Sequence, residues 1–474
     1  MKSTGLKRSL LTTLCIAALS IPSLSLAEAA FPAPVEFKGR IRAESAVPGV
    51  PVHAGGEVRI SATGLAPGQK LVLQRGPDVL SDAALQADEK GSASLTFTLP
   101  ADAAPGLHPL VVLLEEPSMT TTIDLKISKP LDYLNEKDWS VAAVHPAKGL
   151  YQSAYSARSN ALFVTAADFS GGTSELLRLD PETLEVQARI TPADFPEDQK
   201  PPAKEGAPKG PYKLAPAGVF GLGLDEAEGR IWVTNTPDNT IAVYAQDDLS
   251  LIHQFAPGAV YHSRDVLIDP LRKRAFVSSS ATSNVYVFDS ESYEPLGVID
   301  IRSAQRGGEF YVMSLAIDPA RAEVYVVSRI SNELAIIDAA SLEVKKILAL
   351  PGAKNATGLD VDPATGRLFV AAQDSNTLLI LDRDSGEILH DVTVGAGALN
   401  VVYDATSGLA WVSSREAGSL TAVNNDGEIV AHLEGGSYAN HVAIDGKGAV
   451  FAVNKSLGAE DEKADFLRRI TRAD

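Results

Sequence analysis

A β-rich motif that recurs seven times constrains the fold of this chain more than any other feature. After a first step of 69 residues, the copies follow one another every 40 to 49 residues. An aromatic residue marks each copy: Phe163, Trp232, Phe276, Tyr325, Phe369, Trp411 and Phe451. An Asp closes the strand-like run before the marker in six copies: Asp225, Asp269, Asp318, Asp362, Asp404 and Asp445. Each copy has room for four short strands, and this pattern predicts a seven-bladed β-propeller in residues 131–474.

The ends of this array predict how the ring closes. The sequence stops soon after the third strand-like run of the seventh copy, so a fourth strand has to come from elsewhere. The segment 138–147, DWSVAAVHPA, precedes the first copy and is expected to supply it. The long first step contains a Lys- and Pro-rich insertion at 191–216, for which a solvated loop acting as a lid over the propeller is one interpretation.

Residues 28–130 have a different pattern. Six runs of alternating apolar and polar residues lie between Phe37 and Ile127, separated by turns such as Ala-Pro-Gly. Short strands at this spacing predict a β-sandwich. The segments GLAPGQKLVLQRG and TLPADAAPGLHPL resemble bacterial immunoglobulin-like (Ig-like) domains. The predicted fold class is therefore all-β, a seven-bladed β-propeller preceded by an Ig-like β-sandwich that serves as a spacer or docks an envelope protein.

Residues 1–27 have the features of a secretory signal peptide. Three basic residues precede an apolar run from Leu10 to Ile21, and Ser25-Leu26-Ala27 forms a small-x-small cleavage site. This run is too short to span a membrane, and no later run is long enough. Cleavage would remove the only cysteine, Cys15, and change the net charge from −18 to −21. These features predict a periplasmic protein without disulfides or an integral membrane segment.

The repeats resemble those of a known family. RIWVTNTPDNTIAVYAQDDLSLIHQF and ATGLDVDPATGRLFVAAQDSNTLLILDRDSGEIL are similar to the YVTN repeats of bacterial extracellular propellers. Together with the signal peptide and the segment HSRDVLIDP, residues 138–474 resemble the YncE-like periplasmic propeller family. The resemblance implies an exported binding protein without established catalysis, linked to single-stranded DNA and to iron-responsive periplasmic physiology. The N-terminal sandwich departs from the simplest members of that family.

The position of a residue within its repeat predicts which residues lie at one mouth of the propeller, around the axis of the ring. The predicted ligand-binding residues come from the innermost strands and from the loops after the second strands: Tyr151, Gln152, Phe220, His262, Arg264, Tyr311, Arg329, Gln373, Asn400, Arg415, Asn440, His441 and Lys455. Basic groups interleaved with aromatic rings favour an anionic ligand, either single-stranded DNA or a small anion. The alternative is that Arg329 and Arg415 only form ion pairs with loop acids such as Glu416.

The motifs of common enzymes are absent from the sequence. It contains no P-loop, no GxSxG elbow, no HExxH and no CxxCH. DRDSG and NNDG resemble fragments of calcium loops but fit hairpin turns. We therefore predict no catalytic residue, cofactor or metal, and expect a non-catalytic binding protein rather than an enzyme. A divalent ion held by Asp265, Asn400 and His441 is an alternative.

Two other functions stay open at this point. One is a protein-interaction scaffold accessory to an outer-membrane uptake system for iron or a cofactor. The other is a lactonase-like propeller hydrolase. Such enzymes place Glu, Asn and Asp around a metal, whereas the mouth predicted here carries arginines.

Overall fold

The computed structural model describes residues 36–80, 85–168, 172–193, 195 and 217–473. The predicted signal peptide and almost all of the insertion at 191–216 lie outside these residues. The chain divides into two compact units, of which the larger includes Asp124–Asp474 and the smaller includes Ser61–Leu95 and Pro109–Ile123. Within the described ranges, no helix is both long and apolar enough to cross a membrane.

The N-terminal strands form two sheets. One sheet contains β1 (Arg40–Ser45), β2 (Glu57–Thr63) and β6 (Ala93–Thr98). The other contains β4 (Asp78–Val79), β3 (Lys70–Arg75), β7 (Gly106–Leu114) and β8 (Met119–Ile127) in that order, with β5 (Leu85–Gln86) beside β3. Alternate residues of the central strands are buried, such as Val58 and Ile60 in β2 and Leu71 and Leu73 in β3. Each sheet therefore buries one face, as the alternating pattern predicts. The Ig-like topology stays a prediction.

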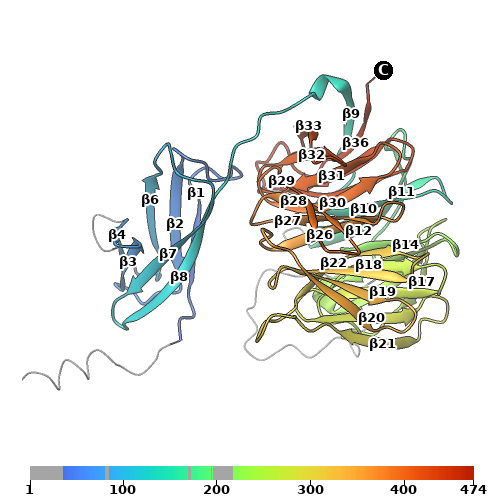
Figure 1. Ribbon diagram of the computed structural model, residues 1–474, viewed down its shortest axis with the longest axis horizontal. Coiled ribbons are helices and arrows are strands. Elements are labelled where there is room, and N and C mark those ends of the chain that lie inside the picture. Colours follow the sequence, from blue (N-terminus) through green and yellow to red (C-terminus); the bar gives the residue numbers. More distant parts are fainter. Residues whose placement is uncertain (1–35, 81–84, 169–171, 194, 196–216, 474) are drawn as a thin grey trace, which may run out of the picture. The chain divides into compact units, whose positions relative to one another are not determined.

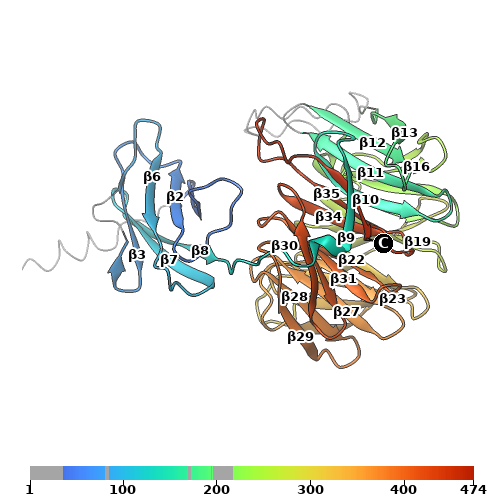
Figure 2. The same cartoon turned by 90° about the horizontal axis from the view of Figure 1, so that it is seen from above.

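Seven four-stranded sheets, the blades, account for the sequence repeats (Figures 1 and 2). Blade 1 contains β10 (Leu150–Ser156), β11 (Ala161–Asp168), β12 (Thr173–Leu179) and β13 (Val186–Ile190). Blade 2 contains β14 (Leu222–Asp225), β15 (Arg230–Asn235), β16 (Thr240–Ala245) and β17 (Leu251–Gln254). Blade 3 contains β18 (Ser263–Asp269), β19 (Arg274–Ser279), β20 (Asn284–Asp289) and β21 (Pro295–Asp300). Blade 4 contains β22 (Val312–Asp318), β23 (Glu323–Ser328), β24 (Glu333–Asp338) and β25 (Val344–Ala349).

The remaining three blades have the same order. Blade 5 contains β26 (Ala356–Asp362), β27 (Arg367–Ala372), β28 (Thr377–Asp382) and β29 (Ile388–Thr393). Blade 6 contains β30 (Ala398–Asp404), β31 (Leu409–Ser414), β32 (Ser419–Asn424) and β33 (Ile429–Glu434). Blade 7 contains β34 (Ala439–Ile444), β35 (Val450–Asn454), β36 (Leu467–Arg472) and β9 (Trp139–Val144). Short 3₁₀ turns occur at η1 (Glu136–Asp138) and η3 (Thr236–Asp238). The predicted fold class, an all-β seven-bladed propeller, is confirmed.

The ring closes between the two ends of the array. The segment predicted for this role, 138–147, contains β9, which pairs with β36 in antiparallel register from Trp139 opposite Arg472 to Val144 opposite Leu467. The innermost strands β10 and β34, from the first and last blades, also lie beside each other. No blade edge is therefore left open at this seam, which removes a free sheet edge.

The aromatic markers form the core between blades. All seven lie on the second strand of their blade and are at most 1% exposed. Each hydrophobic cluster joins two neighbouring blades: Phe276 of blade 3 packs with Val324 and Val326 of blade 4, for example. Contiguous apolar packing of this kind explains why the marker recurs once per blade.

The recurrent Asp residues close turns. Oδ1 of Asp362 accepts the N–H of Ala364 at 3.1 Å, and Oδ1 of Asp404 accepts the N–H of Thr406 at 3.0 Å. An Asp that bonds the backbone two residues on favours a turn over a longer strand. At the same end of blade 5, Asp382 in DRDSG accepts the N–H of Ser385 at 2.7 Å, so this fragment serves a hairpin turn.

Candidate functional site

A backbone hydrogen bond recurs at one mouth of the propeller and holds two loops of a blade side by side. The residue after the second strand donates its N–H to the carbonyl of the residue before the first strand. The pairs are Ser280 to His262 (3.1 Å), Arg329 to Tyr311 (3.0 Å), Gln373 to Asn355 (2.9 Å), Arg415 to Gly397 (2.8 Å) and Lys455 to Tyr438 (3.2 Å). Because this bond joins the two loops, residues at two different positions of the repeat lie at the same mouth of the propeller.

A second hydrogen bond, which recurs in blades 2 and 4, ties the mouth loop of each of these blades to the next blade. Asn239 and Asn332 have left-handed backbone, with φ of 55° and 51°. The side-chain oxygen of Asn239 accepts the N–H of His262 at 2.7 Å, and that of Asn332 accepts the N–H of Asn355 at 2.9 Å. Asn suits both tasks because it tolerates this backbone region and carries an acceptor. These bonds set the spacing between neighbouring loops.

The innermost strands are bulged where they reach the mouth. The pairing register shifts between Ser263 and Val266 in blade 3, and between Ala398 and Asn400 in blade 6. Blades 1, 4, 5 and 7 have a shift at the same place. A bulge re-aims the side chain it carries, and here the affected positions include Arg264 and Asn400.

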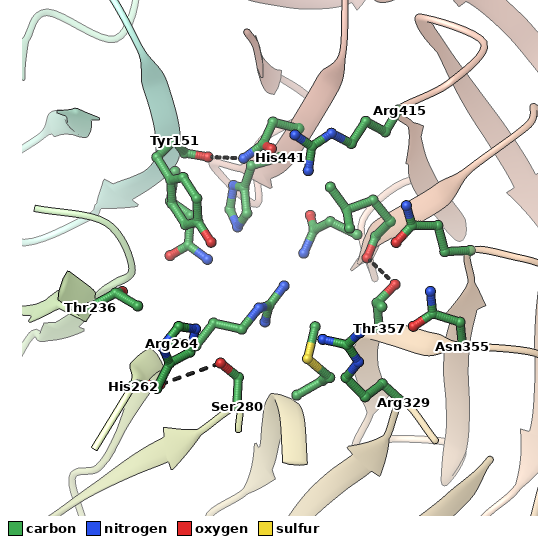
Figure 3. Close-up of a pocket in the computed structure, with 16 residues that line it drawn as sticks. Tyr151, Thr236, His262, Arg264, Ser280, Arg329, Asn355, Thr357, Arg415 and His441 are labelled. Carbon is green, nitrogen blue, oxygen red and sulfur yellow. Dashed lines mark hydrogen bonds between the residues drawn. The ribbon is translucent and has the colours of Figure 1, made fainter. Parts of the chain in front are cut away.

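These elements enclose a cavity of about 280 Å³, the mouth cavity (Figure 3). Ten of the thirteen predicted residues line it: Tyr151, Gln152, His262, Arg264, Arg329, Gln373, Asn400, Arg415, Asn440 and His441. Six further residues complete the lining: Thr236, Ser280, Met313, Asn355, Thr357 and Leu399. Arg264, Arg329, Arg415 and His441 point toward the same central space in Figure 3.

The three arginines of the mouth cavity belong to three different blades. Arg264 donates to the hydroxyl of Ser314 at 3.0 Å, and the guanidinium of Arg415 lies 5.1 Å from the ring centroid of Tyr438. Among the described residues, no carboxylate lies within ion-pair distance of these arginines, and none of the lining residues is acidic. No ion pair joins Arg415 to Glu416, so the described chain lacks the pairing that the alternative interpretation required.

Three neutral side chains, Gln152, Asn400 and His441, form the floor of the mouth cavity, since they also line a second cavity of about 280 Å³. Each of them accepts a backbone N–H from a neighbouring blade. The bonds run from Leu222 to Oε1 of Gln152 (2.8 Å), from Val442 to Oδ1 of Asn400 (3.0 Å) and from Ser153 to Nδ1 of His441 (3.4 Å). The floor therefore joins blades 1 to 2, 6 to 7 and 7 to 1.

Burial and positive neighbours perturb the titratable groups of the mouth. Burial, assisted by Arg264, lowers the pKa of His441 to about 3, so this ring is neutral near pH 7. Burial and Arg329 also lower the pKa of His262. Burial, followed by Arg415, lowers the pKa of Lys455 to about 8, against the opposite effect of Asp465. The arginines are thus the main permanent charges of the site.

Three predicted residues do not line the mouth cavity. Phe220 is 5% exposed and packs edge-on against Tyr151, with ring centroids 5.1 Å apart. Tyr311 is absent from the lining, and its carbonyl accepts the loop bond from Arg329. Lys455 lies behind Tyr151, with its Nζ 4.7 Å from the ring centroid. The predicted set of three aromatic faces is therefore reduced to Tyr151.

Position within the repeat could also have predicted the other residues that line the mouth cavity. Thr236, Ser280, Met313, Thr357 and Leu399 occupy the same two repeat positions as the predicted residues. Asn355 comes immediately before its innermost strand, with φ of 57°. Gly397 and His262, at the same position in other blades, also have left-handed backbone, with φ of 77° and 46°. Asn355 lies seven residues before Asp362, as His262 lies before Asp269, so counting that position in every repeat would have found Asn355.

The second cavity, the inner cavity, lies on the other side of the floor and contains Asp265 and Asp360. Oδ2 of Asp265 accepts the N–H of Leu315 at 3.1 Å, and Oδ2 of Asp360 accepts the N–H of Tyr403 at 2.7 Å. Burial raises the pKa of Asp265, and burial raises the pKa of Asp360 to about 6. In the described ranges, no group of three His, Cys, Asp or Glu side chains is placed to hold a metal ion.

Comparison with known proteins identifies the fold. No model of a known protein family matches the chain, and no characterised protein matches its sequence. Among solved structures, it is similar to a streptogramin B lyase, with a TM-score of 0.54 and 12% identity over 71% of this chain and 99% of the lyase. It is also similar to a catalytically inactive virginiamycin B lyase from Staphylococcus aureus with quinupristin, with a TM-score of 0.53 and 11% identity over 71% of this chain and 100% of the lyase.

These structures correct one expectation from the sequence. The absence of enzyme motifs predicted that this chain is not an enzyme, and that inference is wrong because lyases share its propeller fold. Short motifs capture strand–turn–helix sites, whereas a propeller assembles its site from single residues of many blades. At 11–12% identity the likeness shows the fold alone and assigns no reaction to this chain.

Proposed function

We propose that this protein binds a small anionic ligand in the mouth cavity, with Arg264, Arg329 and Arg415 as its charge partners. The observation that carries the proposal is the convergence of three guanidinium groups without an ion-pair partner in the described chain. Guanidinium groups recognise carboxylate and phosphate through paired hydrogen bonds. A local positive site in a chain of net charge −18 selects for anions against the field of the whole protein.

The geometry favours a small anion over single-stranded DNA. A cavity of about 280 Å³ is at the lower limit of small-molecule sites and has no room for several nucleotides. Non-specific binding of single strands uses successive aromatic platforms. Among the described lining residues, Tyr151 is the one Phe, Tyr or Trp, and the ammonium of Lys455 lies over its ring.

The cellular setting is part of the same proposal. The signal-peptide features of residues 1–27 and the resemblance to YncE-like propellers support a periplasmic location. The N-terminal sheets would then be an Ig-like module that contacts an envelope protein. A scaffold role beside an outer-membrane uptake system is compatible with that module, but it does not explain why three arginines converge in the mouth cavity.

Isothermal titration calorimetry with phosphate, citrate and glucuronate tests the proposal, using residues 28–474. The triple variant Arg264→Ala/Arg329→Ala/Arg415→Ala should lose binding of the anion that the wild type binds. A control triple variant, Arg189→Ala/Lys273→Ala/Lys346→Ala, removes the same charge from exposed positions and should bind normally. Failure of the wild type to bind any anion, or equal binding by both triple variants, would reject the proposal.

A labelled single-stranded oligonucleotide, measured by fluorescence anisotropy, decides between the two anion classes. If the three arginines engage three phosphates, log Kd should change with log salt concentration with a slope of magnitude about 2. Binding of the oligonucleotide with that slope, lost in the cavity variant, would replace the small anion by nucleic acid. We expect no such binding.

A second candidate function is an enzyme that converts the bound anion. The lyases among the solved structures of this fold favour it, together with the lowered pKa of Lys455, about 8, beside the mouth cavity. An amine of this kind exchanges a proton near neutral pH. Proton NMR of each bound anion during incubation would show a new product, and Lys455→Met should slow its formation with little change in Kd.

A further inference from the structure

We infer that the floor of the mouth cavity is a seat for the oxoanion group of the ligand, so that the ligand enters with its carboxylate or phosphate first. This inference rests on the proposed function and adds the chemistry of recognition. Its basis is the direction in which the inter-blade hydrogen bonds hold Gln152, Asn400 and His441.

The two amides of the floor are oriented by backbone donors. A backbone N–H can only donate, so the atom that Leu222 contacts in Gln152 and the atom that Val442 contacts in Asn400 must be the amide oxygen. The NH₂ group of each amide lies on the other side of its carbon. No hydrogen bond within the described chain uses Nε2 of Gln152 or Nδ2 of Asn400. Both side chains line the mouth cavity, so these two nitrogens are donors available to a ligand.

The imidazole of His441 is oriented by the same logic. The N–H of Ser153 donates to Nδ1 at 3.4 Å, which leaves the ring hydrogen on Nε2. The ring is neutral because burial and Arg264 oppose its protonation. Arg264 is thus close enough to add one positive charge to three neutral donors. A small set of fixed N–H donors binds a dehydrated oxoanion without needing a matching number of cations.

The polarity reverses on the other side of the floor. The inner cavity contains the carboxyl groups of Asp265 and Asp360, whose oxygens accept backbone N–H groups. Burial raises the pKa of Asp360 only to about 6, so this carboxylate is mostly ionised at pH 7 and repels an anion that would move further along the axis. The oxoanion should therefore stop at the floor, and the rest of the ligand should extend toward the loops that carry Arg329 and Arg415, whose positive charges add to the attraction for the anion.

The variant Asn400→Asp tests the seat with little change in shape. Its carboxylate still accepts the N–H of Val442, so the bond between blades 6 and 7 is kept, but the cavity-facing donor becomes an acceptor. Gln152→Glu makes the same exchange beside blade 2. Each variant should bind the anion at least ~10-fold more weakly, the usual loss for a hydrogen bond to a charged group. Gln187→Glu, on the exposed strand β13, adds the same charge far from the floor and should not change Kd.

Diffraction from crystals soaked in sodium selenate locates the anion directly through its anomalous signal. We expect selenium within hydrogen-bonding reach of Gln152, Asn400 and His441. A peak only beside Arg329 or Arg415, or an unchanged Kd in Asn400→Asp while the arginine variant fails to bind, would overturn the seat and leave the proposed function intact. No peak and no calorimetric binding in the wild type would overturn both.

Discussion

Replacing Trp139 by Ala should open the ring at its seam. Trp139 begins β9 and is 8% exposed. Its ring meets that of Trp411 edge-on at 4.9 Å and 88°, and the guanidinium of Arg472 lies 4.1 Å from its centroid. Removing a buried Trp costs about 3–5 kcal/mol through lost transfer energy and the cavity left behind. The free energy of unfolding should therefore fall by that amount.

Urea denaturation followed by the fluorescence of the two remaining tryptophans, Trp232 and Trp411, measures this loss. Val141→Ala is the matched control, because Val141 lies on the same strand but is 52% exposed, and it should cost less than about 0.5 kcal/mol. If Trp139→Ala costs no more than Val141→Ala, packing of β9 does not hold the ring closed, and the reasoning is refuted.

The seam also carries part of the site, so the same variant should affect binding. Nδ2 of Asn440 donates to the carbonyl of Tyr151 at 2.6 Å, and Ser153 donates to His441 at 3.4 Å, both between blades 7 and 1. Loosening β9 lets these partners separate. Trp139→Ala should therefore weaken anion binding even where the variant is still folded, as calorimetry at low temperature would show.

Three further predictions concern the loops, the lysine and the turns. Asn332→Ala should cost about 1–2 kcal/mol in urea denaturation, and Asn332→Gly less, because Gly accepts φ of 51° and loses only the bond to Asn355. The folded state disfavours the charged form of Lys455, so the unfolding free energy of the wild type should rise between pH 8 and 10.5, and Lys455→Met should lack this component of the rise. Backbone N–H groups of the turn, chiefly that of Ser385, lower the pKa of Asp382. The stabilisation by this carboxylate is therefore present above the ordinary pKa of 3.8 and is lost on acidification. From pH 5 to pH 3, Asp382→Asn should lose less unfolding free energy than the wild type.

Repeat counting predicted the blades because each blade repeats one packing problem. An aromatic residue such as Trp232 or Trp411 must fill the space between two blades, and an Asp such as Asp362 must close the turn that precedes the strand with the aromatic residue. Both demands act within a few residues of the chain and leave a period in the sequence. Counting along that period also brought Arg329 and Arg415 to one mouth, since the loop bond places them at equivalent positions.

Counting failed where side-chain direction depends on the neighbouring blade. Phe220 and Tyr311 occupy mouth positions in the repeat, yet neither lines the mouth cavity: Phe220 packs against Tyr151, and the carbonyl of Tyr311 accepts the loop bond from Arg329. The lid expected at 191–216 lies outside the described residues. The repeat period does not predict the directions in which side chains such as Phe220 point, because these directions follow from bulges and from contacts between residues far apart in the chain.

Blade number, strand order and the residue types available at the mouth follow from the order of amino acids, because period and alternation are local properties. The character of the cavity follows from the closed ring. Gln152 and Asn400 could present either an oxygen or an NH₂ group, and only the N–H groups of Leu222 and Val442, supplied by the next blade, select the donor. The burial that keeps His441 neutral likewise exists only once blade 7 meets blade 1. The proposed anion seat of neutral donors therefore requires two neighbouring blades in register, and the sequence of a single repeat cannot specify it.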